Sequence, residues 1–169
     1  MRLSLFGPFR ENVRVRFIGD LSRTPSSLQQ HFAHAELKTG GNTGLLLNVA
    51  LSYSGRQDML QACQAIAQKV QDGHLEAHEI GEEHIEQELC TRSMGTLASP
   101  DLLIRTSGEH RLSNFMLWQI AYSELHFSKV YWPDFKELHY KEAILEFQRR
   151  NRRYGGRRTQ TAPPQSVVS

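Results

Sequence analysis

One apolar run limits the possible folds of this chain more than any other feature. Residues 45–51 read LLLNVAL, between Gly44 and the turn Tyr53-Ser54-Gly55. A membrane-spanning helix needs about 20 apolar residues, so this run is too short to span a bilayer. A short, continuous apolar run is typical of a strand buried on both faces of a parallel sheet covered by helices.

The remaining pattern alternates strands with helices. Further strands are predicted at residues 13–18, 101–106 and 125–131, from β-branched and apolar content. Helices are predicted from Thr24-Pro25 to Gly40, and at residues 56–71, 81–90, 114–122 and 138–154. The expected inward-facing residues are Leu28, Phe32, Ala35 and Leu37 in the first helix, Met59, Leu60, Cys63, Ile66, Ala67 and Val70 in the second, and Ile144 and Phe147 in the last. This order predicts an α/β fold with a mainly parallel sheet flanked by helices.

Composition excludes several classes of protein. The 169 residues suit one domain of ordinary size, and a net charge of +2 does not indicate a general polyanion binder. Six arginines nevertheless crowd one stretch: Arg149, Arg150, Arg152, Arg153, Arg157 and Arg158. Such a cluster is usually a solvated helix end, and otherwise a contact for an anion or nucleic acid.

Cysteine usage and hydropathy indicate a soluble, intracellular protein. Cys63 and Cys90 are the two cysteines, and neither has a CxxC neighbour. A disulfide or a zinc site is therefore not indicated, and a reducing compartment fits better. The first residues, MRLSLFGPFRENVRV, become charged too early for a convincing signal peptide.

The loop after the third predicted strand carries the clearest chemistry. Arg105 ends that strand, and Arg111 and Ser113 precede the predicted helix 114–122. Carboxyl ends of parallel strands are where such sheets bind ligands, and guanidinium groups bind phosphate oxygens bidentately. Helix-start N–H groups and the N–H of Leu112 could join the same anion site. Taken singly, Arg105 could pair with Glu109, Arg111 could be a surface cation, and Ser113 could be a helix N-cap.

A nearby carboxylate would become useful if a diphosphate bound there. Glu124 could help to hold Mg²⁺, which takes one or two carboxylates together with phosphate oxygens, or it could be a solvated residue at the start of a strand. His110 is a weaker candidate because imidazole matches magnesium poorly. Phe115, Leu117 and Trp118 are expected to be core residues rather than a substrate wall.

The segment DLLIRTSGEHRLSNFMLWQIAYSEL and the following WPDF closely resemble the cis-prenyltransferases, the family of undecaprenyl and dehydrodolichyl diphosphate synthases. VRFIGD, LLLNVALSYSGRQD and RRNRRYGG also resemble that family, from about residue 13 to residue 156. The resemblance implies an enzyme that condenses isopentenyl diphosphate with an allylic diphosphate, with Mg²⁺ as cofactor.

The resemblance also implies roles for individual residues. Arg105, Arg111 and Ser113, with the N–H of Leu112, match positions that bind the isopentenyl diphosphate group. Glu124 matches a magnesium-associated carboxylate, and His110 a residue near that metal. Arg153 and Gly155 match an Arg-x-Gly motif that reaches the partner's site in a dimer. Leu45 and Leu47 match a strand at the floor of the product tunnel.

Two family patterns have no match in this sequence. One is a loop like MDGNGRW, whose aspartate grips the allylic diphosphate, so no catalytic residue is assigned. The other contains a Ser, an Asn and a Trp followed by Arg-Pro. The expectation is therefore an N-terminally truncated cis-prenyltransferase domain at residues 1–156, with a disordered tail at 157–169 and little activity of its own.

The expected partners and location follow from the same resemblance. A homodimer, or a heterodimer with a homologue, is expected, in the cytoplasm, with peripheral membrane association through the product and no nucleic acid. A targeting segment, if one exists, would lie in the missing half. The alternative function is a non-catalytic partner subunit of a cis-prenyltransferase complex, and a distant third is nucleic-acid binding through the arginine cluster.

Overall fold

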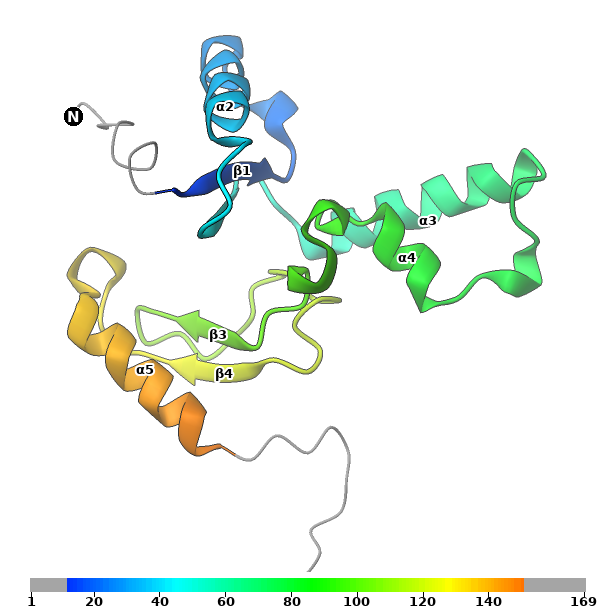
Figure 1. The fold of residues 1–169 in the computed structure, drawn as a ribbon. Coiled ribbons are helices and arrows are strands. Elements are labelled where there is room, and N and C mark those ends of the chain that lie inside the picture. The colour runs from blue at the N-terminus through cyan, green and yellow to red at the C-terminus, as the bar shows by residue number, and fades with distance from the viewer. Residues whose placement is uncertain (1–11, 151–169) are drawn as a thin grey trace, which may run out of the picture. The chain divides into compact units, whose positions relative to one another are not determined.

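The computed structural model describes residues 12–150, which form two compact units. The first unit contains residues up to Pro100 together with Arg111–Ala121, and the second contains Asp101–His110 and the residues from Tyr122 onward. Figure 1 shows the helices and strands. Each unit contains parallel strands and helices, so the α/β class predicted from sequence is confirmed. The single domain predicted over residues 1–156 stays a prediction.

The first unit begins with a parallel pair of strands, β1 (Arg14–Ile18) and β2 (Leu46–Ala50), with Arg14 opposite Leu46. Helix α2 (Ser26–Thr39) connects them and packs on β1 (Figure 1). The rings of Phe17 and Phe32 stack with their centroids 4.4 Å apart. Both predicted strands and the predicted helix are therefore present.

Two helices complete this unit. Helix α3 (Gly55–Gln71) begins after Ser54, whose Oγ accepts a hydrogen bond from the N–H of Gln57. Helix α4 (Glu82–Glu88) packs against α3, and the two are shown side by side in Figure 1. The core here contains Ala62, Ile66 and Leu89.

The second unit is a parallel pair, β3 (Leu102–Arg105) and β4 (Glu124–Phe127), followed by helix α5 (Glu137–Arg149). Ala143 is the fully buried residue of α5, and Ile144 and Phe147 are half-buried, as their predicted inward direction requires. Helix α5 ends at Arg149, earlier than the predicted end at residue 154.

Five inward predictions are wrong. In α2, Leu28 and Leu37 are exposed. In α3, Cys63 and Leu60 are exposed, and Ala67 is exposed as well. The buried face of α3 instead follows Gly55, Asp58, Ala62 and Ile66. Ile66 was predicted to face inward and is buried. Apolar periodicity missed the rest of this face because Gly55, Asp58 and Ala62 are small or polar, and Asp58 is buried as a hydrogen-bond acceptor.

The predicted burial of β2 on both faces is also wrong. Within the described residues β2 pairs with β1 alone, and the side chains of Leu45 and Leu47 are 66% and 42% exposed.

The predicted helix at residues 114–122 is not a helix. The segment consists of turns, and Ser113, Asn114 and Met116 have φ values of 49°, 63° and 46°. A left-handed backbone at these residues cannot continue an α-helix. Consequently Ser113 is not a helix N-cap, and no helix-start N–H groups are present here to bind an anion.

No helix among residues 12–150 is long and apolar enough to cross a membrane. Arg153, Gly155 and the expected tail at 157–169 lie outside the described residues.

Candidate active site

Arg105 is the last residue of β3, at its carboxyl end, as predicted, and is half-buried. The turn that follows is held by the segment after β4. The N–H of Ser107 donates to the carbonyl of Val130 over 2.8 Å, and the N–H of Gly108 to the carbonyl of Ser128 over 2.9 Å. Both turn residues have a left-handed φ, 71° and 70°. The Ser-Gly pair therefore allows a tight turn that fixes the chain direction directly after Arg105.

His110 ends this part of the second unit. Its side chain packs on the ring of Phe127, the last residue of β4, with 5.0 Å between ring centroids. Phe127 is in turn the register partner of Arg105. The aromatic contact therefore positions His110 beside the end of β4.

Glu124, the first residue of β4, belongs to a charged cluster with α5. The Arg150 guanidinium donates from Nη1 to Oε2 of Glu124 over 2.7 Å, and from Nη2 to Oε1 of Glu146. His126 Nδ1 lies 2.6 Å from Oε2 of Glu146. Glu124 and His126 are two residues apart on one strand and so share a face. The cluster joins this face of β4 to the carboxyl end of α5.

The cluster changes the proton affinity of two of its members. Hydrogen bonds from Arg150, and then from His126, lower the pKa of the Glu146 carboxyl group. Hydrogen bonds to Glu124 and then to Glu146 raise the pKa of the Arg150 guanidinium group. The arginine thus stays charged, and it partly neutralises the carboxylate of Glu124.

In the first unit, Arg111 and Ser113 are exposed and Leu112 is half-buried. Hydrogen bonds attach the segment that follows them to the start of α3. Asn114 accepts from the N–H of Arg56 over 2.9 Å through its side chain, and from the N–H of Gly55 over 2.8 Å through its carbonyl. Its Nδ2 donates to the Oγ of Ser54 over 2.8 Å. The side-chain amide of Asn114, and not the predicted N-cap Ser113, therefore holds this segment in place.

Gly55 is needed for this contact. A Cβ at position 55 would lie 3.0 Å from the carbonyl oxygen of Asn114 and 3.0 Å from the backbone nitrogen of Leu117. Both atoms belong to backbone, which cannot move aside as a flexible side chain can. The close approach of two backbones explains the glycine in the sequence Tyr-Ser-Gly-Arg.

Asp58 of α3 is a buried carboxylate that sequence reasoning missed. It is 4% exposed and accepts from the Tyr53 hydroxyl at 2.9 Å and from the Cys90 N–H at 2.8 Å. The Cys90 thiol and the Nε2 of Gln119 also donate to it, each over 3.3 Å. Asp58 therefore links α3, the residues after α4 and the segment that contains Arg111 and Ser113. Asp58 was not among the residues predicted to face inward in this helix, so apolar periodicity gave no signal for it.

This environment affects two neighbours of Asp58. Burial, and then the charge of Asp58, raise the pKa of the Tyr53 phenol. Burial, and then the same charge, raise the pKa of the Cys90 thiol to about 12. Both groups are therefore neutral donors at ordinary pH, as their hydrogen bonds to a carboxylate require.

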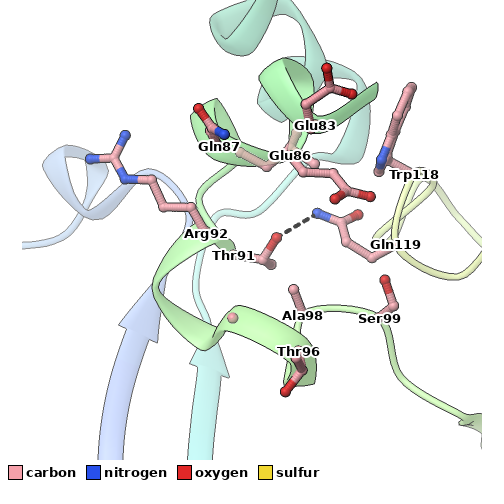
Figure 2. Close-up of a pocket in the computed structure, with 12 residues that line it drawn as sticks. Glu83, Glu86, Gln87, Thr91, Arg92, Thr96, Ala98, Ser99, Trp118 and Gln119 are labelled. Atoms are coloured by element: carbon pink, nitrogen blue, oxygen red, sulfur yellow. Dashed lines mark hydrogen bonds between the residues drawn. The ribbon is translucent and has the colours of Figure 1, made fainter. Parts of the chain in front are cut away.

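A cavity of about 560 Å³ opens in the first unit between α4, the residues after it and the segment near Trp118 (Figure 2). Thr91 and Gln119 lie in it and are joined by a 3.1 Å hydrogen bond. Trp118 is half-buried at its edge, so the expected core role holds only in part, and Phe115 is exposed with its ring edge against Tyr53. None of the residues predicted to bind diphosphate or metal lines this cavity.

The family model for "Putative undecaprenyl diphosphate synthase" matches residues 7–155. The chain belongs to this family. The undecaprenyl diphosphate synthase of Escherichia coli K12, described as specific for (2E,6E)-farnesyl diphosphate, is 52% identical over 147 residues. The chloroplastic cis-prenyltransferase 4 of Solanum lycopersicum is 55% identical over 146 residues. These matches cover 87% and 86% of this chain but 57% and 47% of the relatives.

Solved structures of cis-prenyltransferase relatives have the same fold. The lavandulyl diphosphate synthase of Lavandula x intermedia, solved with dimethylallyl diphosphate, has a TM-score of 0.82 and 40% identity. The match covers 85% of this chain and 60% of that one. A probable undecaprenyl diphosphate synthase from Campylobacter jejuni has a TM-score of 0.74 and 34% identity, with 89% and 67% covered. The family resemblance found in the sequence is therefore confirmed, and the chain spans a little over half the length of the curated bacterial relative.

Proposed function

We propose that this chain takes part in the condensation of isopentenyl diphosphate with an allylic diphosphate to form a cis-polyprenyl diphosphate. The observation that carries the proposal is the 52% identity to the Escherichia coli synthase, within a family match that includes every residue from Arg105 to Glu124. The chain spans 57% of that enzyme, so we propose for it one part of the enzyme's activity, the binding of a diphosphate.

Arg105, Arg111 and Ser113, with the N–H of Leu112, are proposed to bind the diphosphate of isopentenyl diphosphate. Guanidinium groups offer paired N–H donors that fit phosphate oxygens, and a hydroxyl adds one further donor. The exposure of Arg111 and Ser113 supports this role, because exposed groups can reach a ligand. Arg153 and Gly155 are proposed to contact a diphosphate in a partner subunit.

Magnesium is proposed as the cofactor, held by Glu124 at the start of β4. His110 is the other proposed metal residue, and the structure places it against Phe127 at the opposite end of that strand, so it does not bring the two together. Within residues 12–150 no group of three or more His, Cys, Asp or Glu side chains could hold a metal ion. One carboxylate suffices for Mg²⁺ when phosphate oxygens complete its shell, so Glu124 fits this mode. When bound, the ion would neutralise charge on the departing diphosphate. Arg150 holds the same carboxylate in this structure and would have to share or release it.

The chain is proposed to act as a homodimer, or as a heterodimer with a longer homologue, in the cytoplasm, with peripheral membrane association through its product. The non-catalytic partner subunit is the second candidate function. The observation that favours it is the coverage of the relatives, 57% of the bacterial enzyme and 47% of the plant enzyme. A partner subunit would bind diphosphate only together with a complete enzyme.

Calorimetric titration of the full chain with isopentenyl diphosphate, with and without Mg²⁺, tests the proposal. We expect saturable binding that Arg105→Ala weakens about tenfold to a hundredfold, as loss of a charged hydrogen bond implies. Arg23→Ala, at an exposed arginine outside the loop, is the matched control and should bind like the wild type. Absence of binding to the chain alone, together with binding to its mixture with the Escherichia coli enzyme, would favour the partner subunit.

Turnover is a separate readout. Incorporation of labelled isopentenyl diphosphate in the presence of farnesyl diphosphate and Mg²⁺ should be low or absent for the isolated chain. Robust turnover would contradict the assignment of a diphosphate-binding part that needs a complement.

A further inference from the structure

A tight turn in the first unit has a left-handed backbone at both of its central residues. The N–H of Phe115 donates to the carbonyl of Leu112 over 3.1 Å, and Ser113 and Asn114 between them have φ values of 49° and 63°. Positive φ at both central residues is typical of a type I′ turn, in which Gly, Asn and Asp predominate. Ser113 therefore has a backbone conformation that its own side chain does not favour.

Hydrogen bonds from Asn114 to the start of α3 hold this turn. The carbonyl of Asn114 accepts from the N–H of Gly55 over 2.8 Å, and its Oδ1 accepts from the N–H of Arg56 over 2.9 Å. Its Nδ2 donates to the Oγ of Ser54 over 2.8 Å. Unfavourable backbone conformations persist where surrounding contacts enforce them, and they are frequent at ligand sites. These three bonds supply that enforcement at Asn114.

The turn leaves hydrogen-bond donors unused. Its closing bond joins the first and fourth residues, so the N–H groups of Ser113 and Asn114 take no part in it. Among residues 12–150 neither of these N–H groups donates to a protein acceptor. Ser113 is exposed, and its hydroxyl is a further donor. Successive N–H groups in a turn form a concave site for an anion, so the turn offers backbone donors next to a proposed diphosphate ligand.

We propose that Asn114 is a positioning residue for diphosphate binding. By attaching the turn to α3, its side chain fixes the hydroxyl of Ser113 and the N–H groups of both central residues in place before the ligand arrives. Donors that are fixed in advance lose less conformational entropy on binding, so the affinity for the diphosphate rises. This inference rests on the proposed function and extends it to a residue that was not among the predicted diphosphate ligands.

A purely structural role is the alternative, because the same bonds also attach the segment to the first unit. The chain offers a matched control for it. Asn42 is half-buried like Asn114, and its Nδ2 donates to the carbonyl of Val13, the residue before β1, over 2.8 Å. Asn42 thus also joins two segments of this unit through its side-chain amide. Its loss should lower the free energy of unfolding without changing the affinity for a diphosphate.

Calorimetric titration of the full chain and its variants with isopentenyl diphosphate and Mg²⁺ tests this inference. Asn114→Ala should bind about tenfold more weakly than the wild type or worse, because the donors are no longer fixed. Asn42→Ala should keep the wild-type affinity. Asn114→Gly should bind more tightly than Asn114→Ala, since glycine adopts a left-handed φ readily although it lacks the same side-chain bonds. Urea unfolding of each variant measures the structural contribution separately.

The outcomes separate this inference from the proposed function. Equal affinity of the wild type and Asn114→Ala would overturn the inference and leave the proposed function standing. An equal loss of affinity in Asn114→Ala and Asn42→Ala would show a structural role alone and would also overturn it. A wild-type chain that binds no isopentenyl diphosphate would overturn both. If Asn114→Ala does not fold, Asn114→Gly decides, and wild-type affinity in that variant would overturn the inference.

Discussion

Arg150 donates from Nη1 to Oε2 of Glu124 over 2.7 Å, and so joins the residue after α5 to the first residue of β4. Both side chains are about one-third exposed or less, at 30% and 26%. The pair therefore holds the end of α5 at the carboxylate that is proposed to bind magnesium. Arg153, a further proposed diphosphate ligand, follows this anchor by three residues in the sequence.

Arg150→Met should loosen this end of α5. The pair is partly exposed, so its loss should lower the free energy of unfolding by about 1 kcal/mol. Arg149→Met, at the exposed neighbouring arginine, is the matched control and should have a smaller effect. Urea unfolding followed by circular dichroism measures both variants, and equal stability of the two would contradict an anchoring role for Arg150.

The same variant has a second expected effect, on metal binding. Removing Arg150 leaves the carboxylate of Glu124 without its positive partner, so Mg²⁺ should bind more tightly in the presence of isopentenyl diphosphate. Calorimetric titration with Mg²⁺ measures this. Unchanged affinity would show that Arg150 does not compete for Glu124.

Asp58→Asn should destabilise the first unit. An amide retains one acceptor oxygen but places two donors among the Tyr53 hydroxyl and the Cys90 N–H, which are themselves donors. Leaving buried groups unpaired costs about 1–3 kcal/mol. Asp72→Asn, just beyond the last turn of α3 and exposed, is the control and should cost much less. Comparable unfolding midpoints in urea for the two variants would count against the role assigned to Asp58.

Gly55→Ala should disturb the segment after Ser113. The added Cβ would lie 3.0 Å from backbone atoms of Asn114 and Leu117, which is too close for ordinary packing. A loss of about 1–3 kcal/mol is expected, as for other overpacked sites. Gly41→Ala, where a Cβ would meet nothing within 4 Å, should be neutral or slightly stabilising. Equal free energies of unfolding for Gly55→Ala and Gly41→Ala would contradict the close approach of the two backbones at Gly55.

Cys90 should react far more slowly than Cys63 with iodoacetamide at pH 8. The pKa of Cys90 is raised to about 12, first by burial and then by Asp58, so little thiolate is present, whereas Cys63 is exposed. A rate at least a hundredfold lower is expected, measured by mass spectrometry of the labelled peptides. Similar rates at the two cysteines would show that Cys90 is not held as a buried thiol.

The same raised pKa determines how stability depends on pH. The thiol has its usual pKa of 9.0 in the unfolded chain, and burial raises the pKa of Cys90 to about 12 in the folded chain. Between these values the unfolded state binds fewer protons, so the contribution of Cys90 is complete below pH 9 and is lost as the pH rises toward 12. Urea unfolding from pH 8 to pH 10.5 should show a smaller decrease for Cys90→Ala than for the wild type.

Much of the fold follows from local sequence patterns, and the predictions that failed did so for physical reasons. Strand and helix positions such as those of β1 and α3 were predicted because apolar periodicity reports local structure. The helix predicted at residues 114–122 failed because Asn114, which has a left-handed φ, is held by hydrogen bonds to the start of α3, far away in the sequence. The buried face of α3 was missed because Asp58 is buried through acceptor bonds that hydropathy does not describe.

In the candidate site too, local sequence patterns predicted some features, and contacts between residues far apart in the sequence were missed. The place of Arg105 at the carboxyl end of a parallel strand follows from the alternation of strands and helices. The pairing of Glu124 with Arg150 joins residues 26 positions apart, and no spacing rule connects a strand start with the end of a later helix. The exposure of Leu47 depends on which strands lie beside β2, and a single strand pattern does not contain that information.

We propose that the loop from Arg105 to Ser113 binds the diphosphate of isopentenyl diphosphate, and the other proposed roles depend on this binding. Amide chemical shifts of the isotope-labelled full chain, followed during titration with isopentenyl diphosphate and Mg²⁺, test it residue by residue. We expect saturable changes at Arg105, Leu112 and Ser113. Saturable changes confined to the cavity beside Trp118, with none in this loop, would contradict it.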